Sequence, residues 1–314
     1  MRAPAFKKLV AQLQSLTRRQ QQDLAALLRS PTTADPAAAV RLTVCPHCQS
    51  PYVQGWGCTP TGLARSRCRA CHKTATVLTG TPFARLRYRT DWPALMRDLA
   101  DGRPALQIAG RHHVNYKTAV RWVRRWVGAA PSGVTALEGL VEADETFVRR
   151  SAKGRMVERV ALGRLPRKRG GGDSVGKGRR SAAFQPVLVA RSRIGGSAGL
   201  LLPGMTSQEL GAATVQLVAP GAVLITDGLP AWSLASFWAR RQHEPINLAK
   251  GVRVRGIYHL QNVNGSHARF KKFLMAFNGV STHHLPFYLR WFLLREQRQH
   301  PEALMQKVLG TNTR

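Results

Sequence analysis

Acidic residues are scarce in this chain of 314 residues, which has 16 Asp plus Glu against 48 Lys plus Arg. The formal net charge at pH 7 is therefore 48 − 16 = +32. Because 44% of the residues are hydrophobic, this charge belongs to a folded protein and not to a disordered basic tail. A charge of this size indicates a polyanionic partner, with nucleic acid favoured over a membrane surface.

Long apolar runs are also missing, so the sequence predicts no segment that spans a bilayer. The first residues, MRAPAFKKLVAQLQ, carry charge without an apolar stretch, and we expect no secretion signal. There are only five cysteines, and four of them form Cys-x-x-Cys pairs. That arrangement indicates metal binding in a reducing cytosol and argues against disulfides.

The cysteine pairs predict a zinc ribbon over residues 41–83. Cys45 and Cys48 are followed by a gap of 19 residues and then by Cys68 and Cys71. Two knuckles of this spacing can supply four thiolates to one tetrahedral Zn²⁺, with room for a β-hairpin between them. Four protein ligands leave zinc no open position, so the predicted role is structural. Four unliganded cysteines are the alternative.

Helical spacing dominates residues 88–130 and predicts three short helices. Asn115 is the expected cap of the third helix, which should turn Ala119, Val120, Val123 and Val127 inward. This rhythm favours a helix-turn-helix whose last helix reads DNA, although a plain three-helix packing unit remains possible. The residues expected to meet DNA are Lys117, Arg121, Arg124 and Arg125.

Three further segments have features of their own. Residues 1–38 form an N-terminal helical segment, and residues 299–314 form a C-terminal tail. Residues 149–181 are rich in Arg, Lys and Gly, which indicates a basic insertion that either clamps DNA or is simply solvated. Its predicted DNA contacts are Arg167, Lys168 and Arg169.

The stretch LVEADETF, residues 140–147, predicts a β-strand that carries acids. Glu142 and Asp144 would lie on one face and Glu145 on the other. Three acids within four residues are unusual in so basic a chain, and clustered carboxylates commonly hold hard cations such as Mg²⁺. The alternative is that Glu142 and Glu145 pair with arginines at a solvated edge.

A second strand, residues 222–227, ends in Asp227, where open α/β sheets place ligands. The alternative is an aspartate that only caps the turn before Gly228. The predicted order is β-β-β-α-β-α, which is used by ribonuclease H-like nucleotidyl transferases. Their chemistry needs carboxylates that hold two metal ions roughly 4 Å apart. We therefore expect Asp144 and Asp227 to share divalent metal.

The third acid that such enzymes use is not evident here. After Asp227 the only acids are Glu244, Glu296 and Glu302, and none is in a convincing position. Asn264 and Lys271, seven residues apart, would share one face of a predicted helix. Asn264 could bind Mg²⁺ and Lys271 a phosphate, or Asn264 could merely cap the helix.

Several motifs together resemble the bacterial insertion-sequence transposases of the IS1595 group, which have an N-terminal zinc ribbon. The resemblance spans residues 40–295 and rests on the cysteine pairs, TGTPF, VEADETF, PRKRGG, PVLVARSRIGG, LITDGLPAW and YHLQNVNGSHARFKKFLMAFNGVSTHHLPFYL. It implies a multi-domain α/β protein, in which a ribonuclease H-like domain at 135–298 follows the zinc ribbon and the helix-turn-helix.

The resemblance implies strand cleavage at element ends and strand transfer into target DNA, with Mg²⁺ or Mn²⁺ and structural Zn²⁺ as cofactors. Residue by residue it implies the catalytic set Asp144, Asp227, Asn264 and Lys271. It also implies double-stranded DNA as partner, a homodimer or higher assembly on DNA, no membrane, and a cytoplasmic, nucleoid-associated location. The alternative is a DNA-binding regulator that no longer cuts.

Overall fold

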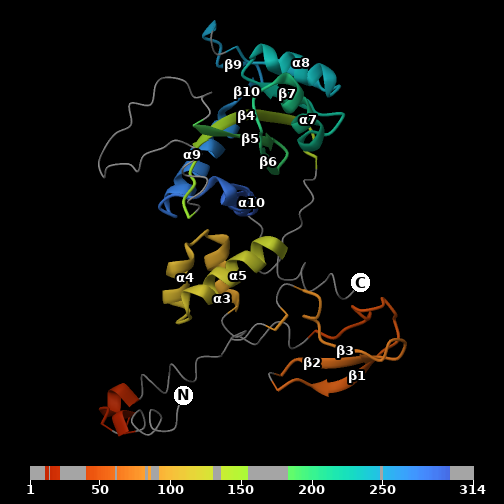
Figure 1. The fold of residues 1–314 in the computed structure, drawn as a ribbon, viewed down its shortest axis with the longest axis vertical. Helices are drawn as coiled ribbons and strands as arrows, with labels where there is room; N and C mark the ends of the chain where they lie inside the picture. Colours follow the sequence, from red (N-terminus) through yellow and green to blue (C-terminus); the bar gives the residue numbers. More distant parts are fainter. Residues whose placement is uncertain are drawn as a thin grey trace. The chain divides into compact units, whose positions relative to one another are not determined.

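The protein is described by a computed structural model (Figure 1). The described residues are 11–13, 15–21, 40–60, 62–81, 84–85, 92–129, 136–154, 183–247 and 250–297. Most of the N-terminal segment, residues 155–181 of the basic insertion and the C-terminal tail therefore lie outside the described residues. The described residues divide into two compact units. The first contains the described residues up to Gly80, together with residues 84–85 and 92–94. The second contains Thr81 and the described residues from Leu95 onward.

The first unit contains a three-stranded antiparallel sheet in the order β1-β2-β3. Strand β1 (Val53–Cys58) and strand β2 (Ala64–Cys68) form a hairpin in the gap between the two cysteine pairs. Strand β3 (Thr74–Ala75) pairs with β2 after the second cysteine pair. The hairpin therefore holds the two cysteine pairs at one end of the same small sheet.

Three helices follow: α3 (Trp92–Ala100), α4 (Ala105–Arg111) and α5 (Tyr116–Ala129). Asn115 caps α5 as expected, because its Oδ1 accepts a hydrogen bond from the Lys117 backbone N–H at 2.9 Å. Val120 is only half-buried, and the buried face of α5 instead includes Trp122 and Trp126. A period of 3.6 residues allows these indoles to share the inward face with the predicted Ala and Val positions.

A five-stranded mixed sheet forms the centre of the second unit, in the order β6-β5-β4-β7-β8. Its strands are β4 (Leu140–Arg149), β5 (Phe184–Ser192), β6 (Ser197–Leu201), β7 (Val223–Thr226) and β8 (Gln242–Pro245). β5 runs antiparallel to β4 and β6, whereas β7 runs parallel to β4 and β8. The chain makes the predicted β-β-β-α-β-α order and then adds β8, a polar edge strand without a hydrophobic pattern.

Two helices, α7 (Ser207–Leu217) and α8 (Pro230–Trp238), pack on one face of this sheet. The core between these helices and the sheet contains Val141 and Ala143 of β4 together with the buried Trp232 of α8. From the sequence alone, Ser207 is the expected cap of α7, but this expectation is wrong. The cap is Thr206, which forms a reciprocal capping box with Glu209.

The other face of the sheet is covered by α9 (Gln261–Met275) and α10 (Leu285–Glu296), with the short 3-10 helix η3 (Thr282–His284) between them. A small hairpin of β9 (Val254–Arg255) and β10 (Tyr258–His259) leads directly into α9. Side chains alternate along β4, so its even-numbered residues face α9.

Within the second unit, the three short helices pack against α9 and α10. The Trp291 Nε1–H of α10 donates to the Leu99 carbonyl at 2.8 Å. At Gly102, in the turn after α3, a β-carbon would lie 2.7 Å from the Phe273 ring, and φ is +73°, so glycine is required. Among the described residues, no helix is long and apolar enough to cross a membrane.

Candidate functional site

The register of the central strands brings the two predicted aspartates together. β4 and β7 pair in parallel, with Leu140 opposite Val223, an offset of 223 − 140 = 83 residues. Asp144 and Asp227 are separated by the same number, 227 − 144 = 83. Continuing the register past the end of β7 therefore sets these two residues opposite each other, with their side chains on one face of the sheet.

The electrostatics of these carboxyl groups agree with that placement. Burial, together with the neighbouring Asp227 carboxylate, raises the pKa of Asp144 from 3.8 to about 7. Lys271 of α9 acts in the opposite direction and lowers the pKa of Asp144. Asp144, Asp227 and Lys271 therefore lie within electrostatic reach of one another, although they come from three different elements.

Helix α9 has three polar residues on the face that lies toward Asp144. Asn264, His267 and Lys271 follow one another at spacings of three and four residues, which places them on one side of the helix. His267 is buried, and its Nδ1 lies 3.7 Å from Asp144 Oδ2. Asn264 and Lys271 are exposed on either side of it. The helix thus aligns this polar face along β4.

His267 is neutral at neutral pH in this environment. Burial and the positive charge of Lys271 lower the pKa of its imidazole to about 4. Its Nε2 is buried and has no hydrogen-bond partner among the described residues. The sequence pattern did not assign His267 a role, although its helical spacing from Asn264 and Lys271 was a usable signal.

Glu145 adds a third carboxyl group to the cluster from the opposite face of β4. It is 9% exposed, and its Oε1 is buried with no hydrogen-bond partner in the described part of the chain. Burial, together with the charges of Asp144 and Asp227, raises its pKa to about 8. The alternative, in which Glu145 pairs with an arginine at a solvated edge, is therefore wrong for this residue.

The donors around Asp144 and Asp227 fit a hard divalent cation. Mg²⁺ and Mn²⁺ prefer carboxylate and carbonyl oxygens, and a nearby cation would relieve the repulsion that raises the pKa of the buried acids. Asp227 Oδ1 also accepts a hydrogen bond from the Leu229 backbone N–H at 3.2 Å, so this residue stabilises the turn as well. Gly228 in that turn has φ +75°.

Asn264 does not cap α9. The helix begins at Gln261 with Leu260 as its N-cap, so Asn264 lies one turn inside, and its backbone N–H donates to the Leu260 carbonyl. Its side chain is therefore not needed for capping. The alternative reading of Asn264 as a helix cap is wrong, and the amide remains a candidate oxygen ligand.

The four paired cysteines form a separate cluster in the first unit. The ligand atoms of Cys45, Cys48, Cys68 and Cys71 all lie within 4.8 Å of one another. Cys45 Sγ is 3.7 Å from Cys71 Sγ, and Cys48 Sγ is 3.6 Å from Cys68 Sγ. A tetrahedral Zn²⁺ with Zn–S bonds near 2.3 Å requires S–S edges of about 3.8 Å. The cluster therefore fits one metal ion.

Each cysteine pair is a tight knuckle of the same geometry. The His47 backbone N–H donates to Cys45 Sγ at 3.4 Å, and the Ala70 backbone N–H donates to Cys68 Sγ at 3.3 Å. Backbone N–H groups, with that of Cys71 first, lower the pKa of the Cys68 thiol to about 6. Such hydrogen bonds stabilise thiolates, the form that binds metal.

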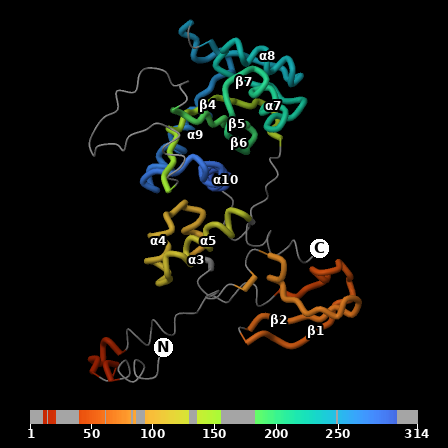
Figure 2. The backbone as a smooth tube through the Cα atoms, in the orientation of Figure 1, coloured from red at the N-terminus to blue at the C-terminus, as the bar shows by residue number. Residues whose placement is uncertain are grey.

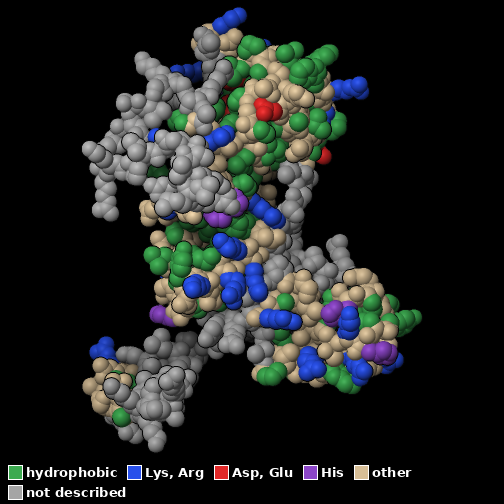
Figure 3. Space-filling model, in the orientation of Figure 1, with side chains coloured by type: hydrophobic (Ala, Val, Ile, Leu, Met, Phe, Trp, Pro, Cys, Tyr) green, Lys and Arg blue, Asp and Glu red, His purple; other side chains and the backbone are tan. Residues whose placement is uncertain are grey.

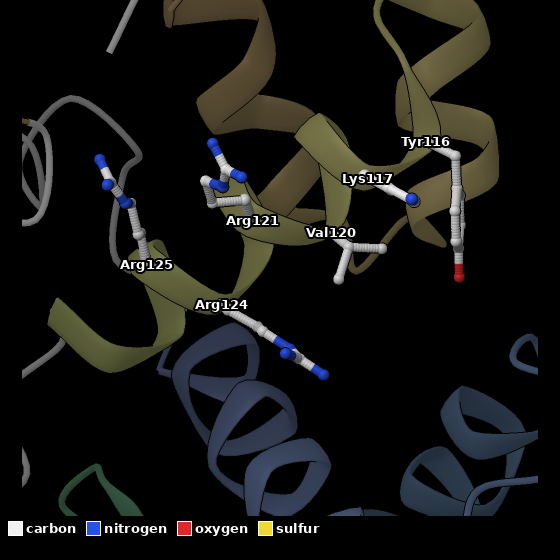
Figure 4. A pocket seen from close by; sticks show the side chains of 6 residues that line it. All are labelled: Tyr116, Lys117, Val120, Arg121, Arg124 and Arg125. Carbon is white, nitrogen blue, oxygen red and sulfur yellow. The ribbon is translucent and has the colours of Figure 1, made fainter. Parts of the chain in front are cut away.

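The exposed side of α5 is basic. Its predicted DNA contacts line a hollow with Tyr116 and Val120, in which Arg121 and Arg125 extend to one side of the helix while Arg124 extends toward the C-terminal helices (Figure 4). Lys117, Arg121 and Arg124 are exposed and Arg125 is half-buried. Lys and Arg side chains also gather over α4 and α5 in the space-filling view (Figure 3). Arg167, Lys168 and Arg169 lie outside the described residues.

Comparison with known proteins identifies the family of this chain. A protein of Halobacterium salinarum, described as "Uncharacterized protein in transposable element ISH50", is 25% identical over 272 residues, 85% of this chain and 90% of that protein. A solved structure of a pre-cleavage Mos1 transpososome aligns over 71% of this chain and 79% of its own, at 12% identity and a TM-score of 0.26, too slight to carry an argument. The ISXO2-like transposase domain matches residues 136–297, more than half of the chain, and the protein belongs to that family.

Proposed function

We propose that this transposase works by DDE-type chemistry on a ribonuclease H-like domain, residues 135–298, with Asp144, Asp227, Asn264 and Lys271 as its catalytic residues. The observation that carries the proposal is the register of β4 and β7, whose offset equals the separation of the two aspartates. The polar face of α9 supplies the other two residues beside them. The reactions are cleavage at element ends and strand transfer into target DNA.

Asp144, Asp227 and the amide oxygen of Asn264 are the residues that would hold Mg²⁺ or Mn²⁺. These ions supply activation of the attacking hydroxyl and stabilisation of the leaving oxygen. Lys271 is exposed on the same face of α9 as Asn264, two helical turns further along, where it would contact a phosphate of the bound strand. His267 between them is neutral and fills the space beside Asp144 without adding charge.

DNA binding is assigned to the basic face of α5 and to the first unit. In this proposal the three helices at residues 88–130 act as a helix-turn-helix, with Lys117, Arg121, Arg124 and Arg125 on DNA. Residues 41–83 act as a zinc ribbon, with structural Zn²⁺ on Cys45, Cys48, Cys68 and Cys71. The basic insertion, with Arg167, Lys168 and Arg169, and a dimer or higher assembly on DNA complete the proposal.

The decisive experiment compares Asp144→Asn and Asp227→Asn with the unchanged protein, using DNA that carries the element ends. We expect both variants to bind the ends with unchanged affinity and to lose cleavage and strand transfer, because each removes a charged oxygen ligand. Asp101→Asn, a change of an exposed acid in the turn after α3, is the matched control and should cleave normally. Retained cleavage by either site variant would refute the assignment. Binding without cleavage by the unchanged protein would favour the regulator.

A further inference from the structure

Glu142 is a second buried acid of β4, two residues before Asp144 and on the same face of the strand. Its side chain is completely buried, at 0% exposure. Glu, Asp, Lys and Arg are almost never fully buried unless they are paired, because an uncompensated buried charge is costly. The partners of Glu142 therefore show what the fold uses it for.

Both oxygens of Glu142 are fully engaged by the start of α9. Oε2 accepts from the backbone N–H groups of Asn262 at 2.9 Å and Val263 at 3.1 Å. Oε1 accepts from Asn262 Nδ2 at 2.7 Å and from Arg193 Nε at 3.1 Å, and His259 Nδ1 lies 3.3 Å away. This saturation leaves no free lone pair directed at a metal ion.

These contacts make Glu142 the N-terminal cap of α9, supplied from another element. The cap residue of the helix, Leu260, makes no side-chain cap bond, and the first turn contains no acidic residue. The N–H groups of a first turn have no partner within the helix, and they are normally satisfied by a local side-chain oxygen. A carboxylate at this end also interacts favourably with the helix dipole. Here the oxygen comes from a strand 120 residues earlier.

Arg193 extends the same attachment to the segment before the helix. Besides Glu142, its guanidinium donates to the backbone carbonyls of Ile257 and His259 in the β9–β10 hairpin. Its own backbone N–H donates to the Leu140 carbonyl in β4 at 3.0 Å. Strand β4 therefore holds both the entry to α9 and its first turn, and α9 lies beside β4 along the backbone path (Figure 2).

We propose that Glu142 is a positioning residue, which fixes the register between the strand that carries Asp144 and the helix that carries Asn264 and Lys271. This inference rests on the proposed function of those residues. The attachment point lies one residue before Asn264 on the helix and two residues before Asp144 on the strand. A shift of α9 by one ångström would therefore move Asn264 relative to Asp144 by the same amount. Displacements of that size can cost on the order of 10²-fold in rate.

The test compares Glu142→Gln with Glu209→Gln in the full-length protein. Glu209 caps α7 on the opposite face of the sheet, and its contacts are local to that helix, so it controls for the loss of a capping carboxylate. We expect both variants to lose thermal stability, and Glu142→Gln to lose more, because Arg193 is left without its buried partner. Only Glu142→Gln should slow cleavage, by roughly 10²-fold, and raise the Mn²⁺ concentration needed for half-maximal cleavage. End binding should be unchanged in both.

A second measurement tests the cap without any activity. Backbone hydrogen exchange of a peptide covering residues 257–270 should speed up in Glu142→Gln and stay unchanged in Glu209→Gln. Glu142→Asp, which keeps the charge, should restore part of the protection and part of the rate. If Glu142→Gln fails to fold, the aspartate variant carries both measurements.

The outcomes separate this inference from the proposed function. If Glu142→Gln cleaves as well as Glu209→Gln, or if exchange at 257–270 is unaltered, the positioning role is wrong. If Asp144→Asn still cleaves, the proposed function fails, and the exchange result alone then decides whether Glu142 caps α9. A Glu142→Gln variant that loses Mn²⁺ binding while exchange at 257–270 is unchanged would make Glu142 a metal ligand and overturn the positioning role.

Discussion

At the scale of single residues, the candidate site destabilises the fold that contains it. Asp144 is half-buried, Glu145 is buried, and both are close to Asp227, so their pKa values rise to about 7 and about 8. Acids held this way are a recurrent feature of functional sites, where a cation or a substrate compensates for the repulsion. The same buried acids give the metal-free protein a measurable pH dependence.

Asp144→Asn should therefore stabilise the metal-free protein at high pH. The folded pKa of Asp144, about 7, lies above the ordinary value of 3.8. Between these values the folded state keeps a proton that the unfolded chain has lost. The contribution of Asp144 to the free energy of unfolding is therefore largest below about pH 4 and falls as pH rises toward 7. The thermal midpoint of the variant minus that of the unchanged protein should increase from pH 5 to pH 8.

The same measurement contains its own controls. Added Mg²⁺ should raise the midpoint of the unchanged protein at pH 8 and leave that of Asp144→Asn nearly unaltered. His267 acts in the opposite direction, because its lowered pKa costs stability as pH falls from 6.5 toward about 4. A midpoint difference that is constant across this pH range would mean that Asp144 titrates normally.

At the scale of elements, the cysteine cluster depends on two knuckles at one end of a three-stranded sheet. The sheet and the turns beside it have few buried apolar side chains, among them Leu63, Ala75 and Val77 at 4%, 6% and 1% exposure. Small metal domains of this kind commonly fold only when the metal is bound, since the binding free energy is also the folding free energy. The stability of this unit should therefore depend on metal.

Cys68→Ser should abolish zinc binding and unfold the hairpin of β1 and β2, while the second compact unit keeps its own unfolding transition. The readouts are the zinc content per chain and hydrogen exchange over residues 53–68. Cys58→Ser is the matched control, because Cys58 is exposed and lies outside the four-cysteine cluster. A Cys68→Ser protein that still binds one zinc with an intact hairpin would rule out the four-thiolate site.

At the scale of the whole molecule, the net charge of +32 should make DNA binding strongly dependent on salt. Each phosphate contact contributes a slope of about −0.9 to the plot of log affinity against log salt concentration. Charge alone does not say which residues contact DNA, because Arg side chains are found on many surfaces of the chain. Removing one positive charge from each of two different helices can separate a direct phosphate contact from general electrostatic attraction to DNA.

Arg121→Ala should lower the magnitude of that slope by about one, because Arg121 is exposed on the proposed reading helix. Arg97→Ala removes the same charge from the exposed side of α3 and should leave the slope nearly unchanged. Fluorescence anisotropy with element-end DNA at several salt concentrations measures both. Equal slopes for the two variants would count against α5 as the DNA-binding helix.

The elements that carry a strong local signal could be predicted from the sequence. The strand with acids at residues 140–147, the strand that precedes Asp227 and the asparagine cap of α5 all appear in the structure. The polar edge strand β8 could not be predicted, since its residues gain their strand conformation only by pairing with β7. The cap of α7 was placed one residue late because Thr206 and Ser207 are both capping residues, and only the Glu209 contact distinguishes them.

The sequence by itself determined the composition of the site: which acids exist, their spacing, and the four cysteines at knuckle spacing. Only the tertiary structure decided that β7 pairs in parallel with β4 at an offset of 83 residues, which brings Asp227 to Asp144. It also decided that Glu142 turns inward to cap α9 and that His267 lies against Asp144. The physical reason is that local spacing fixes which face of an element a side chain occupies, whereas strand register and helix position depend on burial and hydrogen bonds between distant segments.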